Sequence, residues 1–444
     1  MPPAARELAA GPCTGARNVP PTPRTLGAGP CVGADDRSCP LTLDANVYAE
    51  LDRLLTPIDA LRLTRFPGEW PERQPVHTCY VPADAVVPGV AQAWGAAALA
   101  ALDEHGLPDL GLDPELLDEV EPRVRFKLAT EPVEDLRVDA EDGYRGSPDL
   151  EDDDVQHAAA VLADDRAAGT APSSVGIRGK SLEGPTRHRG VRSLDVFLGR
   201  LGGSRVVVTL PKVTDVEQVR AFLSVLDALE AAHGVAVDLE LQIETPQAVL
   251  GPDGTASLAR MVHIAGPRLT GLHYGTYDYS AALGIAAAHQ SSDHPAADFA
   301  KQVMQVAVAG TGAHAVDGST NVLPVGPTEH VHAAWQLHAR LVRRALERGF
   351  YQGWDLHPAQ LVTRYAATYA FFRAALPAAV ARVGAYLDRN DGGVLDEPAT
   401  ARALAGVLVR GLDCGAVDEG EISAAGGPDR AVLDKLAGRR PGGS

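Results

Sequence analysis

The sequence predicts an α/β fold: a (β/α)8 TIM barrel with extra C-terminal helices and a disordered N-terminal tail. Three observations favour this class. Eight short apolar segments alternate with helical stretches along the chain, polar residues gather where those segments end, and no GxGxxG motif follows the first segment. An open, doubly wound sheet is the alternative architecture for the same alternation.

The eight segments expected to form strands are short and bounded by polar or glycine-containing stretches. They cover residues 77–83, 136–142, 175–180, 204–213, 235–245, 269–278, 313–318 and 354–358. Helices are expected between them, because apolar residues recur there at helical spacing and glycine often follows the last turn. The expected helices include 87–105, 148–169, 216–234, 299–310, 329–349, 359–386 and 400–412.

The chain divides by composition into three parts. Residues 1–40 are rich in Pro, Gly, Ala and Arg without an apolar period, which predicts a flexible tail. Residues 41–361 hold the eight strands and are expected to form the catalytic barrel domain. Residues 362–444 are expected to form a helical extension that contributes to a neighbouring subunit's site in a homo-oligomer.

Charge and composition exclude several partners. The formal net charge is −18, and no basic footprint for nucleic acid is visible. No run of about 18 apolar residues predicts a membrane span, and no charged and apolar leader pattern predicts secretion. The five cysteines form no CxxC pair, so reduced thiols in a cytoplasmic protein are expected, with a zinc site in the tail as the alternative.

Two carboxylates end neighbouring predicted strands. Glu244 closes LELQIET and Asp278 closes LHYGTYD, about one strand–helix–strand unit later. Because the carboxyl ends of barrel strands converge on one face, these acids are expected to hold Mg²⁺, with Mn²⁺ as an alternative. The other interpretation is that each acid caps the helix that follows it.

Basic residues lie at the same predicted face. Arg178 offers a planar fork that matches a substrate carboxylate, although the nearby acidic stretch is an alternative partner. Lys212 is expected to bind substrate electrostatically or to support the site, with a Schiff-base role as the alternative. The run containing Arg187, Arg189 and Arg192 could bind a phosphate or a second carboxylate, or pair with the acidic stretch.

The ordered motifs HTCYVPA, RVDAEDGY, VGIRGK, LPKV, QIETPQAV, YGTYDYSAALG, HAVDG and GWDLHPAQ resemble those of the citrate lyase β-subunit/HpcH–HpaI aldolase superfamily. The resemblance covers about residues 73–361. It implies Mg²⁺ ligation by Glu244 and Asp278 and binding of a substrate carboxylate or enolate oxygen by Arg178. It also implies a close approach of the backbone to the substrate near Gly275.

The resemblance assigns further acids to the site. Asp139, Glu141 and Asp142 would border it, by binding water molecules on the metal ion or by orienting Arg178. HpaI-type aldolases have a histidine base at the position of Asp142. This sequence has an aspartate there instead, as does the citrate lyase-like branch. The loop GGVLDEPATARALA resembles one that supplies an acid to a neighbouring subunit, with Asp396 as the match. Asp391 and Glu397 are alternates, and capping of the next helix is the other interpretation.

These observations predict a Mg²⁺-dependent carbon–carbon lyase or aldolase that acts next to a carbonyl through a metal-stabilised enolate. The expected substrate is a 2-oxo acid of pyruvate type. The alternatives are a CoA-ester lyase acting on an acyl-CoA, phosphoenolpyruvate or phosphoryl chemistry supported by the basic run, and a catalytically idle barrel that binds a metabolite.

Overall fold

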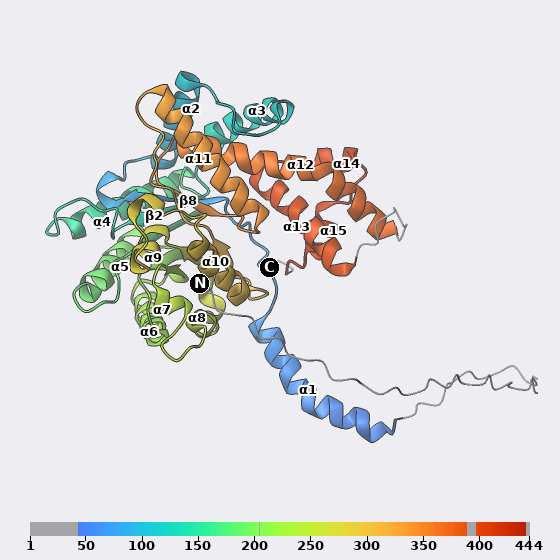
Figure 1. Cartoon of the computed structure of the whole chain (residues 1–444). Coiled ribbons are helices and arrows are strands. Elements are labelled where there is room, and N and C mark those ends of the chain that lie inside the picture. The colour runs from blue at the N-terminus through green and yellow to red at the C-terminus, as the bar shows by residue number, and fades with distance from the viewer. Residues whose placement is uncertain (1–42, 204, 389–396, 441–444) are drawn as a thin grey trace, which may run out of the picture. The chain divides into compact units, whose positions relative to one another are not determined.

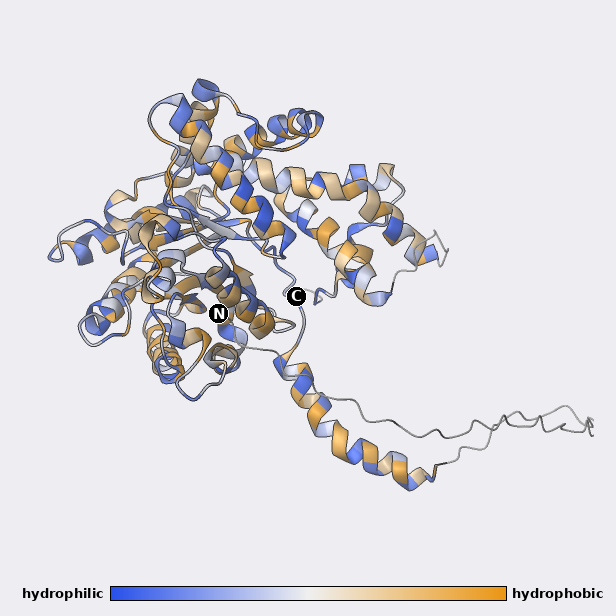
Figure 2. Cartoon of the chain, in the orientation of Figure 1, coloured by the Kyte–Doolittle hydropathy of each residue, from blue (hydrophilic) through white to orange (hydrophobic). Residues whose placement is uncertain are grey.

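The protein is represented by a computed structural model, which describes residues 43–203, 205–388 and 397–440. The chain separates into two compact units, Met1–Thr56 and Pro57–Ser444. The division falls within helix α1 (Ala45–Arg65), none of whose residues is buried. Figure 2 shows hydrophobic and hydrophilic residues alternating along this helix. The predicted tail, residues 1–40, lies outside the described residues.

The second unit contains the predicted barrel. Eight parallel strands follow the order β7-β6-β5-β4-β3-β2-β1-β8, so neighbours in sequence are neighbours in the sheet and β1 pairs with β8. The backbone N–H of Asp317 donates to the carbonyl of Gln352 at 2.9 Å and joins the two ends of this order. The strands are β1 His77–Pro82, β2 Asp135–Asp139, β3 Ser174–Arg178, β4 Arg205–Leu210, β5 Ala236–Ile243, β6 Leu269–Tyr274, β7 His314–Val316 and β8 Gly353–Asp355.

Helices surround the strands and extend beyond them (Figure 1). Local signals set their boundaries. Asp113 caps α3 ahead of Pro114, and Asp215 forms a capping box with Gln218 at the start of α6. The helices after α1 are α2 Val90–His105, α3 Pro114–Thr130, α4 Glu151–Ala168, α5 Arg187–Leu201, α6 Val216–His233, α7 Pro246–Val249, α8 Ser257–Ala265, α9 Thr276–Ala282, α10 Pro295–Val308, α11 Thr328–Glu347, α12 Gln360–Asp388, α13 Pro398–Cys414, α14 Glu419–Ala424 and α15 Arg430–Ala437.

The sequence predicted the strands better than the helices. The predicted strand 269–278 was too long: β6 ends at Tyr274, and the remaining residues begin α9. Helix α3 lies between α2 and β2, where no helix had been predicted, and α5 covers the basic run. The predicted boundary between barrel and extension, 361/362, falls inside α12, so that division stays a prediction.

Helix α12 is, among the described residues, a helix long and apolar enough to cross a membrane by length and composition. Every residue from Gln360 to Ala370 is nevertheless buried within the fold. The helix packs against α3, α11 and α13. Its first half therefore has the environment of a core helix.

The middle of the barrel is polar. Arg137, only 1% exposed, donates from Nε and Nη2 to Glu240 at 3.1 and 2.6 Å and from Nη1 to Asp135 at 2.5 Å. Bulky branched residues usually fill this position in such barrels. Gly176 makes room for the arginine, because a Cβ there would lie 3.1 Å from Arg137 Cδ and 2.0 Å from the carbonyl oxygen of Val207.

Candidate active site at the carboxyl ends of the strands

Glu244 lies directly after β5 and is buried, with 1% of its surface exposed. Its Oε1 accepts the backbone N–H of Lys212 at 2.7 Å, and its Oε2 accepts the side-chain amide of Gln242. The alternation of inward positions along β5 explains this orientation, since Glu240, Gln242 and Glu244 point to the same side. The predicted inward position of Glu244 is thereby explained by strand geometry.

Gly275 makes the position of Glu244 sterically feasible. A Cβ on Gly275 would lie 2.5 Å from Glu244 Cβ and 2.6 Å from its Oε2. The glycine has an ordinary negative φ of −95°, so space and not backbone conformation requires it. The close backbone approach expected at Gly275 is, in this structure, an approach to the Glu244 carboxylate.

Asp278 lies in the first turn of α9, and its side chain is 46% exposed. Its Oδ2 lies 3.6 Å from Lys212 Nζ. The capping interpretation is wrong for both predicted ligands. Thr245 caps α7 with its own hydroxyl oxygen, and Gly275 is the N-cap residue of α9.

Lys212 lies between the acids. Its ammonium contacts Glu141 Oε1 at 2.6 Å and Asp142 Oδ2 at 2.7 Å, in addition to Asp278. We call Glu141, Asp142, Glu244 and Asp278 the carboxylate cluster. Its members come from the ends of β2 and β5 and from the start of α9, so the fold brings four of the predicted acids to one place.

Arg178 ends β3 and is firmly held. Its Nε and Nη2 donate to the two oxygens of Asp139 at 2.9 and 2.6 Å, and its Nη1 donates to Gln242 Oε1 at 3.1 Å. The guanidinium carbon lies 4.7 Å from the centre of the Tyr80 ring and 5.8 Å from that of Trp354. Bidentate pairing and ring contacts fix the guanidinium plane.

Arg178 also reaches the carboxylate cluster. Its Nη1 lies 3.6 Å from Glu141 Oε2, which is within ion-pair distance but too long for a hydrogen bond. A guanidinium has five N–H donors. Within the described part of the chain, one hydrogen on Nη1 and one on Nη2 therefore remain available for a substrate oxygen.

The charges in the cluster shift its ionisation. Burial raises the pKa of Glu244 to about 8, with the negative charges of Glu141 and Asp278 adding to it and Lys212 opposing it. Burial also raises the pKa of Glu141. Burial opposes ionisation of Asp142, but the hydrogen bond and charge of Lys212, together with the charge of Arg178, lower its pKa. The single charge of Lys212 therefore does not neutralise all the acids of the cluster.

Other predicted residues lie elsewhere. Asp396 falls in 389–396, outside the described residues, and its role stays a prediction. The basic run pairs with the acidic helix α4, because Arg189 Nε lies 3.0 Å from Glu151 Oε2 and Arg192 pairs with Asp152. Of the two interpretations of that run, the structure supports internal pairing.

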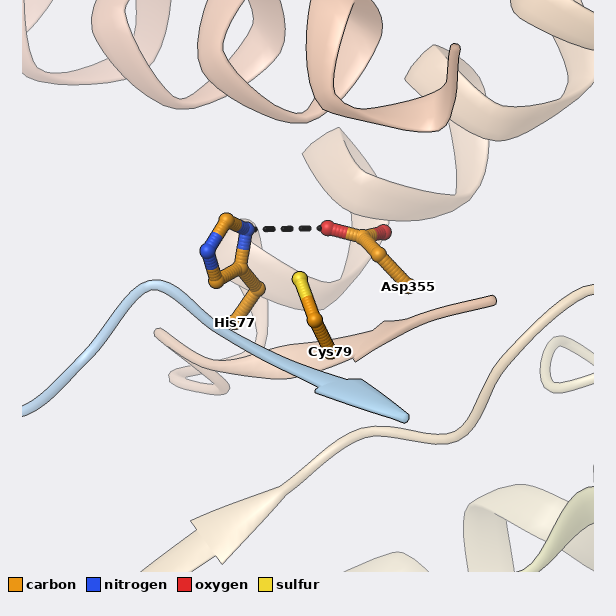
Figure 3. A group of neighbouring side chains, drawn as sticks. All are labelled: His77, Cys79 and Asp355. Carbon is orange, nitrogen blue, oxygen red and sulfur yellow. Dashed lines mark hydrogen bonds and ion pairs between the residues drawn. The ribbon is translucent and has the colours of Figure 1, made fainter. Parts of the chain in front are cut away.

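A second buried group, His77, Cys79 and Asp355, has donor atoms within 4.8 Å of one another (Figure 3). His77 Nε2 accepts the backbone N–H of Glu134 at 3.1 Å, so its Nδ1 carries the proton and donates to Asp355 at 3.0 Å. Burial raises the pKa of the Cys79 thiol well above its usual value. Neither the thiol nor the imidazole offers a free lone pair of the kind a metal ion requires.

Two more side chains complete this second group. Arg364 donates from Nη2 to Asp355 Oδ1 at 3.0 Å, and His338 Nε2 lies 3.2 Å from the same oxygen. We call His77, His338, Asp355 and Arg364 the Asp355 network. It connects β1 and β8 with α11 and α12 and has the features of a structural core network.

A cavity of about 360 Å³ lies at the opposite end of the barrel. Its lining includes Trp70 from the loop before β1, the first residues of β2, β4 and β7 (Asp135, Arg205 and His314), and Arg137 and Glu240 from the middle of the barrel. Active sites of such barrels lie at the carboxyl ends of the strands. We therefore place the candidate site at the carboxylate cluster and not at this cavity.

Gln242, Tyr80 and Trp354 were not predicted as site residues. Gln242 connects Arg178 to Glu244, and the two rings hold Arg178 in place. The two-residue period of β5 could have identified Gln242. The ring contacts had no local signal, because the rings come from strands β1 and β8.

Solved structures share this fold. A citrate lyase from Burkholderia xenovorans LB400 matches with 19% identity and a TM-score of 0.54, over 81% of this chain and 98% of that chain. A Haloferax volcanii malate synthase, solved as a lead(II) complex, matches with 14% identity and a TM-score of 0.47, over 66% of this chain and 72% of that chain. At 19% identity the first match shows the fold alone, and the predicted resemblance is confirmed for the fold.

The chain belongs to the family described as "Domain of unknown function (DUF6986)", which matches residues 55–441. The match covers most of the chain, from α1 to beyond α15. No curated protein matches the sequence.

Proposed function

We propose that the protein is a divalent-cation-dependent carbon–carbon lyase or aldolase that acts next to the carbonyl of a 2-oxo acid or pyruvate-type substrate. The observation that carries the proposal is the carboxylate cluster beside Arg178, with fewer cations than acids. The name of the Burkholderia structure, citrate lyase, agrees with this reaction class.

The residues fit a hard cation. The cluster supplies only oxygen donors, which Mg²⁺ prefers, with Mn²⁺ as the alternative. Gly275 leaves the space in which the Glu244 carboxylate lies, and Glu244 is buried where a cation would offset the cost of its charge. Glu244 and Asp278 would hold the ion. When bound, Mg²⁺ polarises a carbonyl oxygen and stabilises negative charge that develops there.

Arg178 would bind the substrate's carboxylate or enolate oxygen. Asp139 fixes two of its nitrogens, and the remaining hydrogens on Nη1 and Nη2 supply donors for an anionic oxygen. Because these donors are already oriented, they stabilise negative charge where it forms without reorganisation. Gln242 supports both Arg178 and Glu244 as a positioning residue.

A carboxylate of the cluster would accept the proton of the substrate hydroxyl as the carbon–carbon bond breaks. Asp142 is a candidate, since its side chain is 61% exposed and the hydrogen bond from Lys212 favours its ionised form. Asp396, supplied by a neighbouring subunit, is the other candidate base. In the reverse direction the same group would return the proton after carbon–carbon bond formation.

Solvent deuterium exchange tests the proposal. Pyruvate-type 2-oxo acids and acyl-CoAs are incubated with the protein and Mg²⁺ in D₂O, and loss of the proton signal next to the carbonyl is followed by NMR. Exchange is expected with Mg²⁺ and is expected to disappear in Glu244→Gln. Exchange with acyl-CoAs alone would select the CoA-ester lyase. Absence of exchange with every compound would contradict the lyase assignment.

A further inference from the structure

Lys212 has an unusual position for a lysine side chain. One ammonium lies 2.6 Å from Glu141, 2.7 Å from Asp142 and 3.6 Å from Asp278, so three carboxylates share a single positive charge. These acids belong to two separate segments of the chain. The ammonium is therefore the cation around which the acids converge in this structure.

The backbone at Lys212 is strained in a way that serves this arrangement. Lys212 is the only non-glycine residue with positive φ, 51°, in the described part of the chain. This conformation directs its N–H to Glu244 Oε1 at 2.7 Å while its side chain reaches the other acids. A strained residue that contacts every acid of a proposed site suggests function.

Lys180 offers a comparison at the same face of the barrel. Its ammonium lies 2.7 Å from the carbonyl oxygen of Ala140 and 3.1 Å from Glu151, which also pairs with Arg189. Two cations, Lys180 and Arg189, therefore face the single carboxylate of Glu151. At Lys212 the acids outnumber the cation, and a divalent ion would neutralise them better than an ammonium does.

We infer that Lys212 is an internal counter-cation that holds the carboxylate cluster together and is exchanged for the divalent ion. The inference rests on the proposed function, since it assumes that the cluster binds such an ion. The side chain is 23% exposed, which gives the ammonium a route towards solvent. Once displaced, the ammonium remains at the rim of the site, where it can pair with an anionic group of the substrate.

Mg²⁺ titration calorimetry tests the exchange directly. Lys212→Met removes the ammonium, so Mg²⁺ no longer has to displace it, and binding about 10-fold tighter or more is expected. Lys212→Gln, a polar replacement, should show the same direction if the Met variant folds poorly. The control Lys180→Met should bind Mg²⁺ as the wild type does, because Lys180 does not contact the cluster.

The outcomes separate this inference from the proposed function. Unchanged or weaker Mg²⁺ binding in both Lys212 variants would overturn the exchange while leaving the cation site in place. Absence of Mg²⁺ binding in the wild type and in every variant would overturn the proposed function together with the exchange. Tighter binding that disappears in the double variant Lys212→Met/Glu244→Gln supports both.

A second measurement needs no substitution. An amine-reactive reagent should label Lys212 faster when Mg²⁺ is added, because the displaced ammonium loses its carboxylate partners and becomes accessible. Peptide mass spectrometry reads the labelling, with Lys180 as the internal reference. Equal labelling of Lys212 with and without Mg²⁺ would contradict the exchange.

Discussion

The carboxylate cluster and the Asp355 network are both places where acids and cations meet, but their charge balance differs. In the Asp355 network one buried carboxylate faces Arg364 and two histidines. In the carboxylate cluster the Lys212 ammonium faces three acids and its backbone N–H bonds the fourth, Glu244. Arg178, 3.6 Å from Glu141, is already paired to Asp139. Removing one partner from a balanced, buried group destabilises a fold, whereas a surplus of acid at a partly exposed position attracts a cation.

The largest effect is expected at the Asp355 network. Asp355→Asn leaves the buried Arg364 without its counter-ion, which should lower the free energy of unfolding by about 3–5 kcal/mol. Urea denaturation measures the loss. Mg²⁺ affinity should not change, because the network does not contact the cluster. A loss below about 1 kcal/mol would show that Asp355 is not the centre of a structural network.

Lowering the pH should reduce the difference in the free energy of unfolding between the wild type and Asp355→Asn. Although burial raises the pKa of Asp355, Arg364 and the histidines outweigh it and hold the pKa well below its usual value. A carboxylate with a lowered pKa in the folded state stabilises the fold above its unfolded pKa of about 3.9, and this contribution falls as the pH drops below that value. Unfolding of wild type and Asp355→Asn at pH 7 and pH 3 should therefore differ most at pH 7.

A substitution in the carboxylate cluster is expected to reduce activity and not stability, in contrast to Asp355→Asn. Glu244→Gln is expected to reduce lyase activity at least about 100-fold, because the ion supplies several kcal/mol of charge stabilisation. With a chelator present, the free energy of unfolding of Glu244→Gln should equal or exceed that of the wild type. Burial raises the pKa of Glu244 to about 8, so the stability contributed by this group falls as the pH rises from its unfolded pKa of about 4.3 towards 8. If Glu244→Gln lost stability as well as activity, the distinction between the carboxylate cluster and the Asp355 network would not hold.

A smaller effect is expected at Gly275. In Gly275→Ala the new Cβ would lie 2.5 Å from Glu244 Cβ, so the carboxylate must move. Mg²⁺ affinity should fall by about 10-fold to 100-fold, as for loss of a supporting contact around a metal ligand. Gly184→Ala is the matched control, since its Cβ would meet nothing within 4 Å. Equal affinities in the two variants would mean that Gly275 does not position Glu244.

The smallest effect is expected at the surface. Arg192 pairs with Asp152, but its side chain is 65% exposed. Arg192→Ala should change the free energy of unfolding by less than about 1 kcal/mol, because exposed ion pairs contribute little. Thermal or urea unfolding checks this. A larger loss would mean that the pairing of α4 with α5 contributes more than its exposure indicates.

Much of the fold could be predicted from local patterns. Strands β1 to β8 were found within a few residues because barrel strands are short, apolar and followed by polar residues. The end of β6 was misplaced because aromatic residues such as Tyr277 fit a strand by propensity, whereas Gly275 is the N-cap residue of α9 and the residues after it are helical. Helix α3 was missed although Asp113 and Pro114 signal its start.

The sequence by itself determined the order of the strands and the acids and Arg178 at their carboxyl ends, because periodicity and chain order are local properties. Only the tertiary structure decided which charges neutralise which. Lys212 meets acids from β2 and α9, and Gln242 connects Arg178 with Glu244, through contacts between distant segments. Such pairings depend on the closed sheet and on a strained φ at Lys212, which no local residue pattern encodes.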